Sequence, residues 1–189
     1  VVLAVTVAND PAVARTLGVP GRPDRVPGLG PLGGLATALW WAREEGLEGA
    51  FVLACDLPLV GEELVGAILG RWPEDAAAVV PESPGSRGFE PLCAAFSVEC
   101  LPAVEARMAS GRRSMKGLAE AVEAWRVPAG DLAEPEALAL ALTNVNTRAE
   151  AAKAEALLGR RAESKDAMRG AGAMGEGNAH SRRGKGERP

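Results

Sequence analysis

Short apolar runs and amphipathic helical patterns alternate along most of this 189-residue chain. Four runs are apolar on both faces and are bounded by Pro, Gly or Asp, which is typical of strands inside a sheet. They are Val1–Ala8, Ala50–Cys55, Ala76–Val80 and Leu92–Phe96. Strands that alternate with helices predict crossover connections, so we expect an α/β fold with a mostly parallel sheet covered by helices on both faces.

Helix signals separate and follow these strands. The first pattern has Asn9 or Asp10 as its cap and Pro11 near its first turn, and the second, at 31–46, repeats Leu at helical spacing and ends at Gly46. Further helices are expected at 61–72, 98–111, 112–122, 134–142 and 147–161, with a late strand in 124–129. The second half of the chain is therefore predicted to be the more helical one.

The end of the chain has a different composition. Apolar periodicity is lost over 163–189, where Gly, Ser and basic residues are frequent, and burial in such a segment cannot offset the entropy of ordering it. We expect a disordered tail at 163–189. Residues 1–162 are predicted to form one domain of ordinary size.

Composition narrows the classes of function. The chain is 47% hydrophobic and 24% charged, as globular proteins are, and no apolar run approaches the roughly 20 residues that span a membrane. With a net charge of −4 it has no basic footprint, so we expect no nucleic-acid and no membrane partner. Cys55, Cys93 and Cys100 have no CxxC spacing and no secretory signal ahead of them, which favours reduced core thiols in a cytoplasm. His180 is the only histidine and tyrosine is absent, which argues against His-based triads and zinc sites.

Asp56 is the clearest candidate for chemistry. The segment "FVLACDLPLV" runs a buried strand directly into this carboxylate, and ligands of open parallel sheets bind outside the carboxyl ends of the strands. A single carboxylate there suits Mg²⁺, which substrate phosphates and water can complete. The alternative is a cap of the following helix or turn, but the helical pattern starts only near Gly61, beyond the ideal cap offset.

The segment "PDRVPGLGPLGGL" is a second candidate. Asp24 precedes it and is either a second anionic group of a site or a turn residue. Gly28 and Gly30 permit positive φ and close backbone approach, and Pro31 suits the first turn of a helix. Gly33 lowers helix propensity with no local gain, so either a ligand or tight packing must press against that face. The segment does not have the Walker lysine spacing.

Three weaker candidates follow later in the chain. "TNVNTRAE" places Asn144 and Asn146 on a potential short strand so that both face one way, although turn and cap residues look the same. "SGRRSMKG" places two arginines at a helix start, where they suit a phosphate or are simply solvated. In "SRGFEPLCAAF", Arg87 and Glu90 either line a pocket or belong to an ordinary hairpin loop.

The ordered combination of these motifs resembles the molybdenum cofactor guanylyltransferases of the MobA-like nucleotidyltransferase family. The resemblance covers about Val1 to Leu158. It is carried by "PDRVPGLGPLGGLATAL", "VLACDLPLV", "EPLCAAF", "SGRRSM" and "LTNVNTRAEAAKAE". It implies a Rossmann-like fold of nucleotidyltransferase type and transfer of GMP from GTP to the phosphate of molybdopterin, with release of pyrophosphate.

The resemblance also implies roles for residues and partners. Asp56 would be the catalytic residue that binds Mg²⁺ and the nucleotide phosphates, and Asp24 would help to hold the guanosine nucleotide. The stretch Gly30, Pro31, Leu32 and Gly33 would line the nucleotide site. The substrate-binding residues would be Arg112, Arg113, Asn144 and Asn146, with the two asparagines near the pterin. Transient contact with other proteins of molybdenum cofactor biosynthesis or with molybdoenzymes is a further implication.

One departure from the family pattern bears on activity. Family members begin with a strand and a loop of the type LAGGxSxRMGxDK, and Val1–Asn9 instead resembles their second strand. We expect an incomplete gene model or a truncated chain. The alternatives are a transferase that uses CTP or another phosphorylated acceptor, and a non-catalytic remnant that binds nucleotide or pterin.

Overall fold

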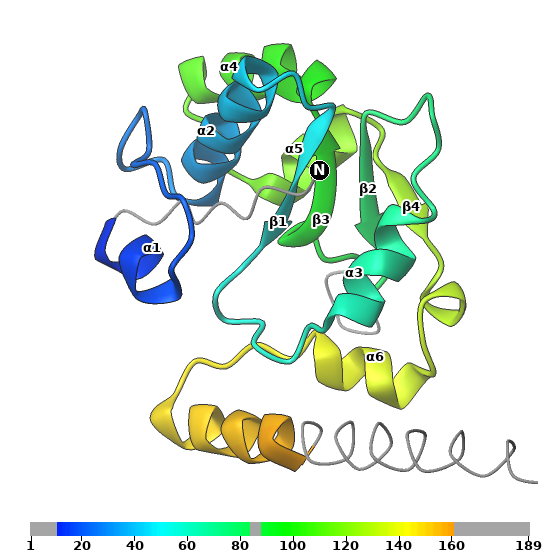
Figure 1. The fold of residues 1–189 in the computed structure, drawn as a ribbon. Coiled ribbons are helices and arrows are strands. Elements are labelled where there is room, and N and C mark those ends of the chain that lie inside the picture. Colours follow the sequence, from blue (N-terminus) through cyan, green and yellow to red (C-terminus); the bar gives the residue numbers. More distant parts are fainter. Residues whose placement is uncertain (1–10, 84–87, 161–189) are drawn as a thin grey trace, which may run out of the picture. The chain divides into compact units, whose positions relative to one another are not determined.

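The computed structural model describes residues 11–83 and 88–160 (Figure 1). The chain divides into two compact units, Val1–Asn144 and Val145–Pro189. Several sequence predictions fall outside the described residues. These are the strand Val1–Ala8, the cap at Asn9 or Asp10, Arg87 and the tail 163–189. The predicted domain boundary at residue 162 stays a prediction.

Among the described residues, the first unit contains one four-stranded sheet in the order β1-β3-β2-β4. Its strands are β1 (Gly49–Leu53), β2 (Ala78–Pro81), β3 (Cys93–Ser97) and β4 (Trp125–Val127). β3 is antiparallel to β1 and β2, whereas β2 and β4 are parallel. β1, β2 and β4 thus share the direction that was expected, and β3 is reversed. No helix connects β2 to β3 in the described part of the chain, and a parallel return would need such a crossover.

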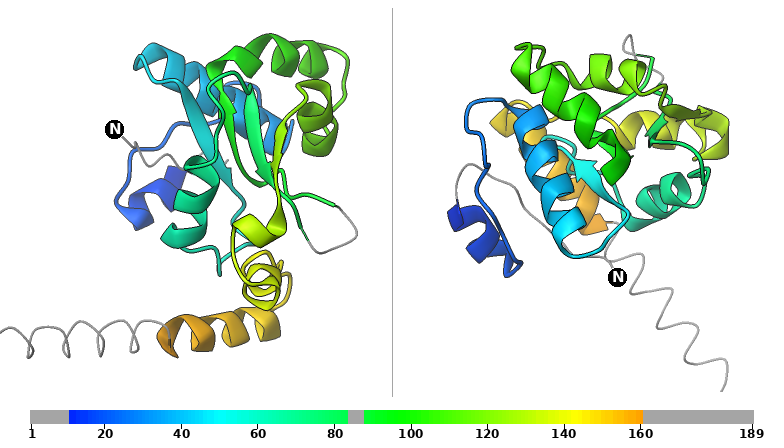
Figure 2. Two further views of the ribbon diagram at one scale, coloured as in Figure 1. Left: turned by 90° about the vertical axis from the view of Figure 1, so that its right-hand side faces the viewer. Right: turned by 90° about the horizontal axis from the view of Figure 1, so that it is seen from above.

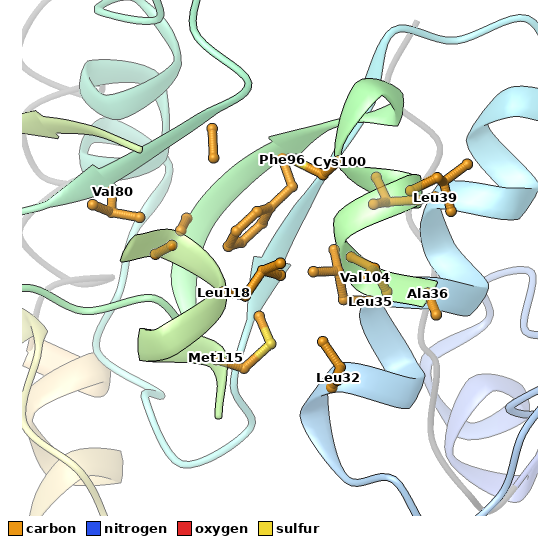
Figure 3. Close-up of a cluster of buried hydrophobic side chains, with 14 of the residues drawn as sticks. Leu32, Leu35, Ala36, Leu39, Val80, Phe96, Cys100, Val104, Met115 and Leu118 are labelled. Carbon is orange, nitrogen blue, oxygen red and sulfur yellow. The ribbon is translucent and has the colours of Figure 1, made fainter. Parts of the chain in front are cut away.

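Helices cover both faces of this sheet, which confirms the predicted α/β class. α2 (Pro31–Glu44), α4 (Leu101–Ala109) and α5 (Met115–Ala121) pack on one face around Phe96, as Figure 3 shows. α3 (Glu62–Leu69) and α6 (Pro135–Ala141) pack on the other. Neighbouring residues of β2 point in opposite directions because side chains alternate along a strand, so Val80 joins the first cluster and Val79 the second. Figure 2 shows α2 and α3 on opposite sides of the sheet.

The helix boundaries follow local signals. Pro31 is the first residue of α2. The N–H of a residue at this position has no intrahelical acceptor, so the lack of an N–H in proline costs the helix no hydrogen bond. The side chain of Ser114 accepts the N–H of Gly117 and caps α5. The remaining helical segments of this unit are α1 (Pro11–Leu17) and the short 3-10 turns Val98–Cys100 and Ala129–Asp131. Each predicted helix that lies in the described part of this unit is present.

The second unit contains a helix at 148–160, as predicted. Its start is a capping box: the carboxylate of Glu150 accepts the N–H groups of Asn146 and Thr147, and Thr147 Oγ1 accepts the N–H of Glu150. Of the two alternatives for Asn144 and Asn146, the short strand is absent, since neither residue has a strand partner among the described residues. The backbone N–H of Asn146 is used by the cap instead.

Topology brings the candidate segments of the first unit to one edge of the sheet. α2 ends at Glu44 and β1 begins at Gly49, so the first turn of α2 lies toward the carboxyl end of β1. The N–H of Ala54 donates to the carbonyl of Leu92 at 2.9 Å, which places the chain before β3 at the same edge. This carboxyl edge is the lower side of the sheet in Figure 1. It is where ligands of α/β sheets bind.

Candidate functional site

Asp56 lies in the turn that follows β1 at the carboxyl edge. The turn is closed by a hydrogen bond from the N–H of Leu57 to the carbonyl of Ala54 at 3.1 Å. α3 begins only at Glu62, and Gly61 stands at its N-cap position. The alternative role of Asp56 as a helix cap is therefore excluded, as the spacing predicted.

The two carboxylate oxygens of Asp56 differ in their surroundings. Asn144 Nδ2 donates to Oδ2 at 2.9 Å, across 88 residues of sequence. Oδ1 is buried and has no hydrogen-bond partner among the described residues. A buried carboxylate oxygen without a partner is costly unless something binds it. Asn144 thus fixes the carboxylate with one oxygen left for a ligand.

This arrangement fits a hard divalent cation. Mg²⁺ takes oxygen ligands and is commonly held by one or two carboxylates, with water and substrate phosphates completing its shell. In residues 11–83 and 88–160, no three His, Cys, Asp or Glu side chains cluster so that they could hold a metal. A cation at Asp56 would therefore depend on its substrate for further ligands.

Asp24 lies in the loop before α2 and is half-buried. Its Oδ1 is buried without a hydrogen-bond partner in the described part of the chain, and burial raises the pKa of this carboxyl above its ordinary value. A Cβ on Gly33 would lie 3.6 Å from Asp24 Oδ2 and 3.1 Å from both the Leu29 Cβ and the Val26 carbonyl oxygen. The sequence left a ligand and tight packing as explanations for Gly33. The structure shows tight packing, because the loop before α2 lies directly against the helix at this position.

The glycines of this loop leave its backbone open. Gly28 has φ 80° and Gly30 has φ 60° with ψ −146°, conformations that L side chains rarely adopt. A Cβ on either would meet no atom of the described chain within 4 Å. Pro31 is exposed, whereas the Leu32 side chain is fully buried in the core, so only the backbone of Leu32 could contact a ligand.

Thr37, which the sequence analysis did not single out, holds the Asp24 loop on α2. Its Oγ1 accepts the N–H of Arg25 at 3.0 Å and donates to the carbonyl of Gly33 at 3.0 Å. Its exposure is 1%. A hydroxyl on the apolar face of the predicted helix was the available signal, because a buried polar group needs a partner.

A charged cluster next to this loop was also missed. Glu44 forms ion pairs with Arg22 and Arg25, the residues on either side of Asp24, and these bonds, that from Arg22 first, lower the pKa of Glu44. The Arg22 guanidinium lies 4.1 Å from the centroid of Trp41, and that of Arg25 lies 5.1 Å from the centroid of Trp40. The chain on both sides of Asp24 is thereby attached to the last turns of α2.

The two predicted arginines lie in the loop between α4 and α5, not at a helix start, because Ser114 caps α5 after them. Arg112 Nε donates to Ser110 Oγ at 2.9 Å. Arg113 Nη1 donates to the carbonyl of Gly28 at 2.9 Å. The structure therefore brings Arg113, and not Arg112, to the glycine loop.

The remaining candidates are placed as follows. Glu90 is 3% exposed and its Oε1 accepts the N–H of Leu92 at 3.2 Å, at the carboxyl edge. Cys93 and Cys100 are core residues, as predicted; burial, with a smaller contribution from Glu90, raises the pKa of Cys93 to about 12, and burial raises that of Cys100 to about 11. Cys55 is exposed, so its prediction as a core residue is wrong, because it lies beyond the end of β1.

No helix of the described residues is long and apolar enough to cross a membrane.

Comparisons with known proteins identify relatives of this chain. Residues 2–128 match the family described as the MobA-like NTP transferase domain. A protein of Desulfosudis oleivorans named molybdenum cofactor guanylyltransferase is 32% identical over 113 residues, which are 60% of this chain and 55% of that protein. A Mycobacterium bovis protein named "Probable molybdenum cofactor guanylyltransferase" is 34% identical over 134 residues, 71% of this chain and 62% of that protein.

The fold is also shared with a solved structure. The crystal structure of molybdopterin-guanine dinucleotide biosynthesis protein A from Archaeoglobus fulgidus superposes with a TM-score of 0.63 at 22% identity, over 82% of this chain and 78% of that chain. The matches to the two curated relatives span only 55% and 62% of their lengths. The family match covers most of the first unit, including Asp24, Asp56 and Arg113. The chain therefore belongs to the MobA-like NTP transferase domain family.

Proposed function

We propose that this chain carries the nucleotide site of a molybdenum cofactor guanylyltransferase. In the reaction, an oxygen of the molybdopterin phosphate attacks the α-phosphorus of GTP, the bond from that phosphorus to the bridging oxygen of the β-phosphate breaks, and pyrophosphate leaves. The observation that carries the proposal is the Asp56 carboxylate, with Oδ2 held by Asn144 and Oδ1 buried and unpartnered in the described part of the chain.

Asp56 would bind Mg²⁺, which would neutralise the phosphate oxygens of GTP when bound. Asn144 donates to Asp56 and so keeps the carboxylate in one orientation. Because nucleotidyl transfer depends mainly on positioning and on charge neutralisation, the site needs no histidine. The resemblance implies that Asn144 also contacts the acceptor, molybdopterin. A position beside Asp56 is compatible with this contact, since the attacking oxygen of molybdopterin must approach the α-phosphorus of GTP.

Asp24 would hold the guanosine end of the nucleotide. A half-buried carboxylate repels phosphates but accepts N–H donors, and the guanine base presents such donors. Its unpartnered Oδ1 and the open backbone at Gly28 and Gly30 support this assignment. Gly30, Pro31, Leu32 and Gly33 would contribute backbone, since the Leu32 side chain is in the core and Gly33 has none. Asp24 and Asp56 would thus bind opposite ends of GTP.

Other parts of the proposal rest on the family resemblance. Asn146, Arg112 and Arg113 are proposed to contact the substrates, with the asparagines toward the pterin. The protein would act in the cytoplasm, in keeping with its three free cysteines, and would contact molybdenum cofactor proteins or molybdoenzymes transiently. We propose no nucleic-acid and no membrane partner. A transferase specific for CTP and a binding protein without turnover are the outcomes against which the proposal is tested.

The test is calorimetric titration of the chain with GTP and with CTP, each with and without Mg²⁺. We expect binding that prefers GTP, depends on Mg²⁺ and is lost in Asp56→Asn. Thr143→Val is the control, because Thr143 is exposed and its Oγ1 donates to the Ala139 carbonyl of α6, four residues earlier. Equal binding of CTP would point to another transferase, and metal-independent binding that Asp56→Asn leaves unchanged would refute the assignment. Pyrophosphate release on addition of molybdopterin separates turnover from binding alone.

A further inference from the structure

We infer that Arg113 is a positioning residue of the nucleotide site, which fixes the glycine loop through the Gly28 carbonyl, whereas its neighbour Arg112 is not. The contacts described below support the position of Arg113. Its effect on GTP binding rests on the proposed function. It separates two arginines that the sequence presents as one basic pair. It also assigns Arg113 to the nucleotide and not to the acceptor phosphate.

The contact joins distant parts of the first unit. Arg113 Nη1 donates to the Gly28 carbonyl at 2.9 Å, across 85 residues of sequence. Gly28 and Gly30 both have positive φ, and nothing in the described chain packs where their side chains would be. Glycine loses more backbone conformational entropy than other residues when it is ordered. A hydrogen bond from a charged donor in this segment is therefore expected to narrow its range of conformations.

The loop that carries Arg113 is itself well fixed. Gly111 has φ 69° and its N–H donates to the Met108 carbonyl, and the N–H of Arg112 donates to the Arg107 carbonyl at 2.9 Å, which ends α4 in a tight turn. On the far side of Arg113, Arg107 Nη2 donates to the Ser114 carbonyl at 3.2 Å. The guanidinium of Arg113 thus extends from a loop anchored on both sides.

Gly117 makes the second of these anchors available. A Cβ at Gly117 would lie 2.5 Å from Arg107 Nη2, so a larger residue there would displace the Arg107 side chain. The absence of a side chain at this position of α5 is explained by the path of Arg107. Arg107 thus holds the loop at Ser114, and the same loop carries Arg113, whose guanidinium donates to Gly28.

Arg112 provides the matched comparison. It is adjacent in sequence, exposed and equally charged, but its Nε donates to Ser110 Oγ within its own turn. If a general positive potential ordered the glycine loop, Arg112→Ala and Arg113→Ala would loosen the loop alike. If the Gly28 contact is responsible, only Arg113→Ala affects the loop.

The experiment measures hydrogen exchange of the peptide that spans 24–32 in the ligand-free chain. We expect Arg113→Ala to accelerate exchange about 2- to 10-fold there, as loss of one hydrogen bond implies, and Arg112→Ala to leave it unchanged. Unchanged exchange in Arg113→Ala, or equal acceleration in both variants, overturns the inference. A single cooperative urea unfolding transition in each variant shows that both variants remain folded.

Substrate kinetics distinguish this inference from the proposed function. With GTP and molybdopterin, Arg113→Ala is expected to raise KM for GTP by a similar factor and to leave KM for the acceptor unchanged. A rise in the acceptor KM alone would overturn the assignment to the nucleotide. If the parent chain binds no GTP while exchange changes only in Arg113→Ala, the proposed function fails and the positioning of the loop by Arg113 stands.

Discussion

Replacing Thr37 with valine tests the attachment of the Asp24 loop to α2. The substitution keeps the shape of the side chain and removes the hydroxyl, so the N–H of Arg25 loses its partner and the Gly33 carbonyl loses one donor. The site is 1% exposed, so water cannot take over the place of the hydroxyl. We expect the loop that contains Asp24 to loosen and the free energy of unfolding of the first unit to fall.

The magnitude follows from the two hydrogen bonds. Each neutral bond contributes about 0.5–1.5 kcal/mol net, and the Gly33 carbonyl, inside α2, keeps its place in the helix, so we expect a total loss of about 1–2 kcal/mol. With a urea m value of about 2 kcal/mol/M, the unfolding midpoint would move down by about 0.5–1 M.

Urea unfolding followed by tryptophan fluorescence measures this shift, because Trp40 and Trp41 lie on the same helix. The control is Thr143→Val, since Thr143 is exposed and its Oγ1 donates to the Ala139 carbonyl, four residues earlier, at 2.7 Å. It should change the stability by less than about 0.5 kcal/mol. Equal midpoints for Thr37→Val and the parent chain would refute the role of Thr37.

Three further predictions concern the thiols, the proposed base-binding carboxylate and the loop. In the native chain at pH 8, only Cys55 should react quickly with a thiol reagent, since it is exposed while burial raises the pKa of Cys93 to about 12 and of Cys100 to about 11; rapid reaction of all three would contradict the core. Burial raises the pKa of the Asp24 carboxyl above 3.8, so the folded chain holds this proton more tightly than the unfolded chain does. The stability that the protonated carboxyl contributes is therefore lost as pH rises through the raised pKa. Asp24→Asn should therefore unfold at higher urea than the parent at pH 7, with the difference shrinking toward pH 3.8, and should bind GTP more weakly; a lower midpoint at pH 7 would contradict this. Gly30→Ala forces alanine into φ 60°, ψ −146° and should cost about 1–3 kcal/mol in the same urea experiment, whereas an unchanged midpoint would mean that the loop readily adopts another conformation.

Local patterns predicted most of the elements. Buried apolar runs identified β1, β2 and β3, and the spacing between Asp56 and Gly61 correctly indicated that Asp56 does not cap α3. The cap at Thr147 was likewise visible, because the Thr and Glu150 of a capping box are only three residues apart. Signals of this kind are carried by neighbours in sequence and survive without knowledge of the fold.

Long-range contacts could not be predicted in the same way. The direction of β3 depends on which strands it pairs with, and its apolar run would look the same in a parallel and in an antiparallel arrangement, because it is buried on both faces. Asn144 meets Asp56 across 88 residues and Arg113 meets Gly28 across 85, so only the folded chain shows these pairs. Thr37 was overlooked because its role depends on the return of the Asp24 loop onto α2.

The most direct test of the account locates the bound metal and nucleotide on the chain. Mn²⁺ in place of Mg²⁺, added with GTP, broadens the NMR signals of nearby amides. We predict broadening at residues 54–57 and at Asn144, weaker broadening in the glycine loop around Gly28 and Gly30, and none of it in Asp56→Asn. Broadening centred on another part of the first unit, or identical spectra for Asp56→Asn and the parent chain, would contradict the assignment of the site to Asp56 and Asn144.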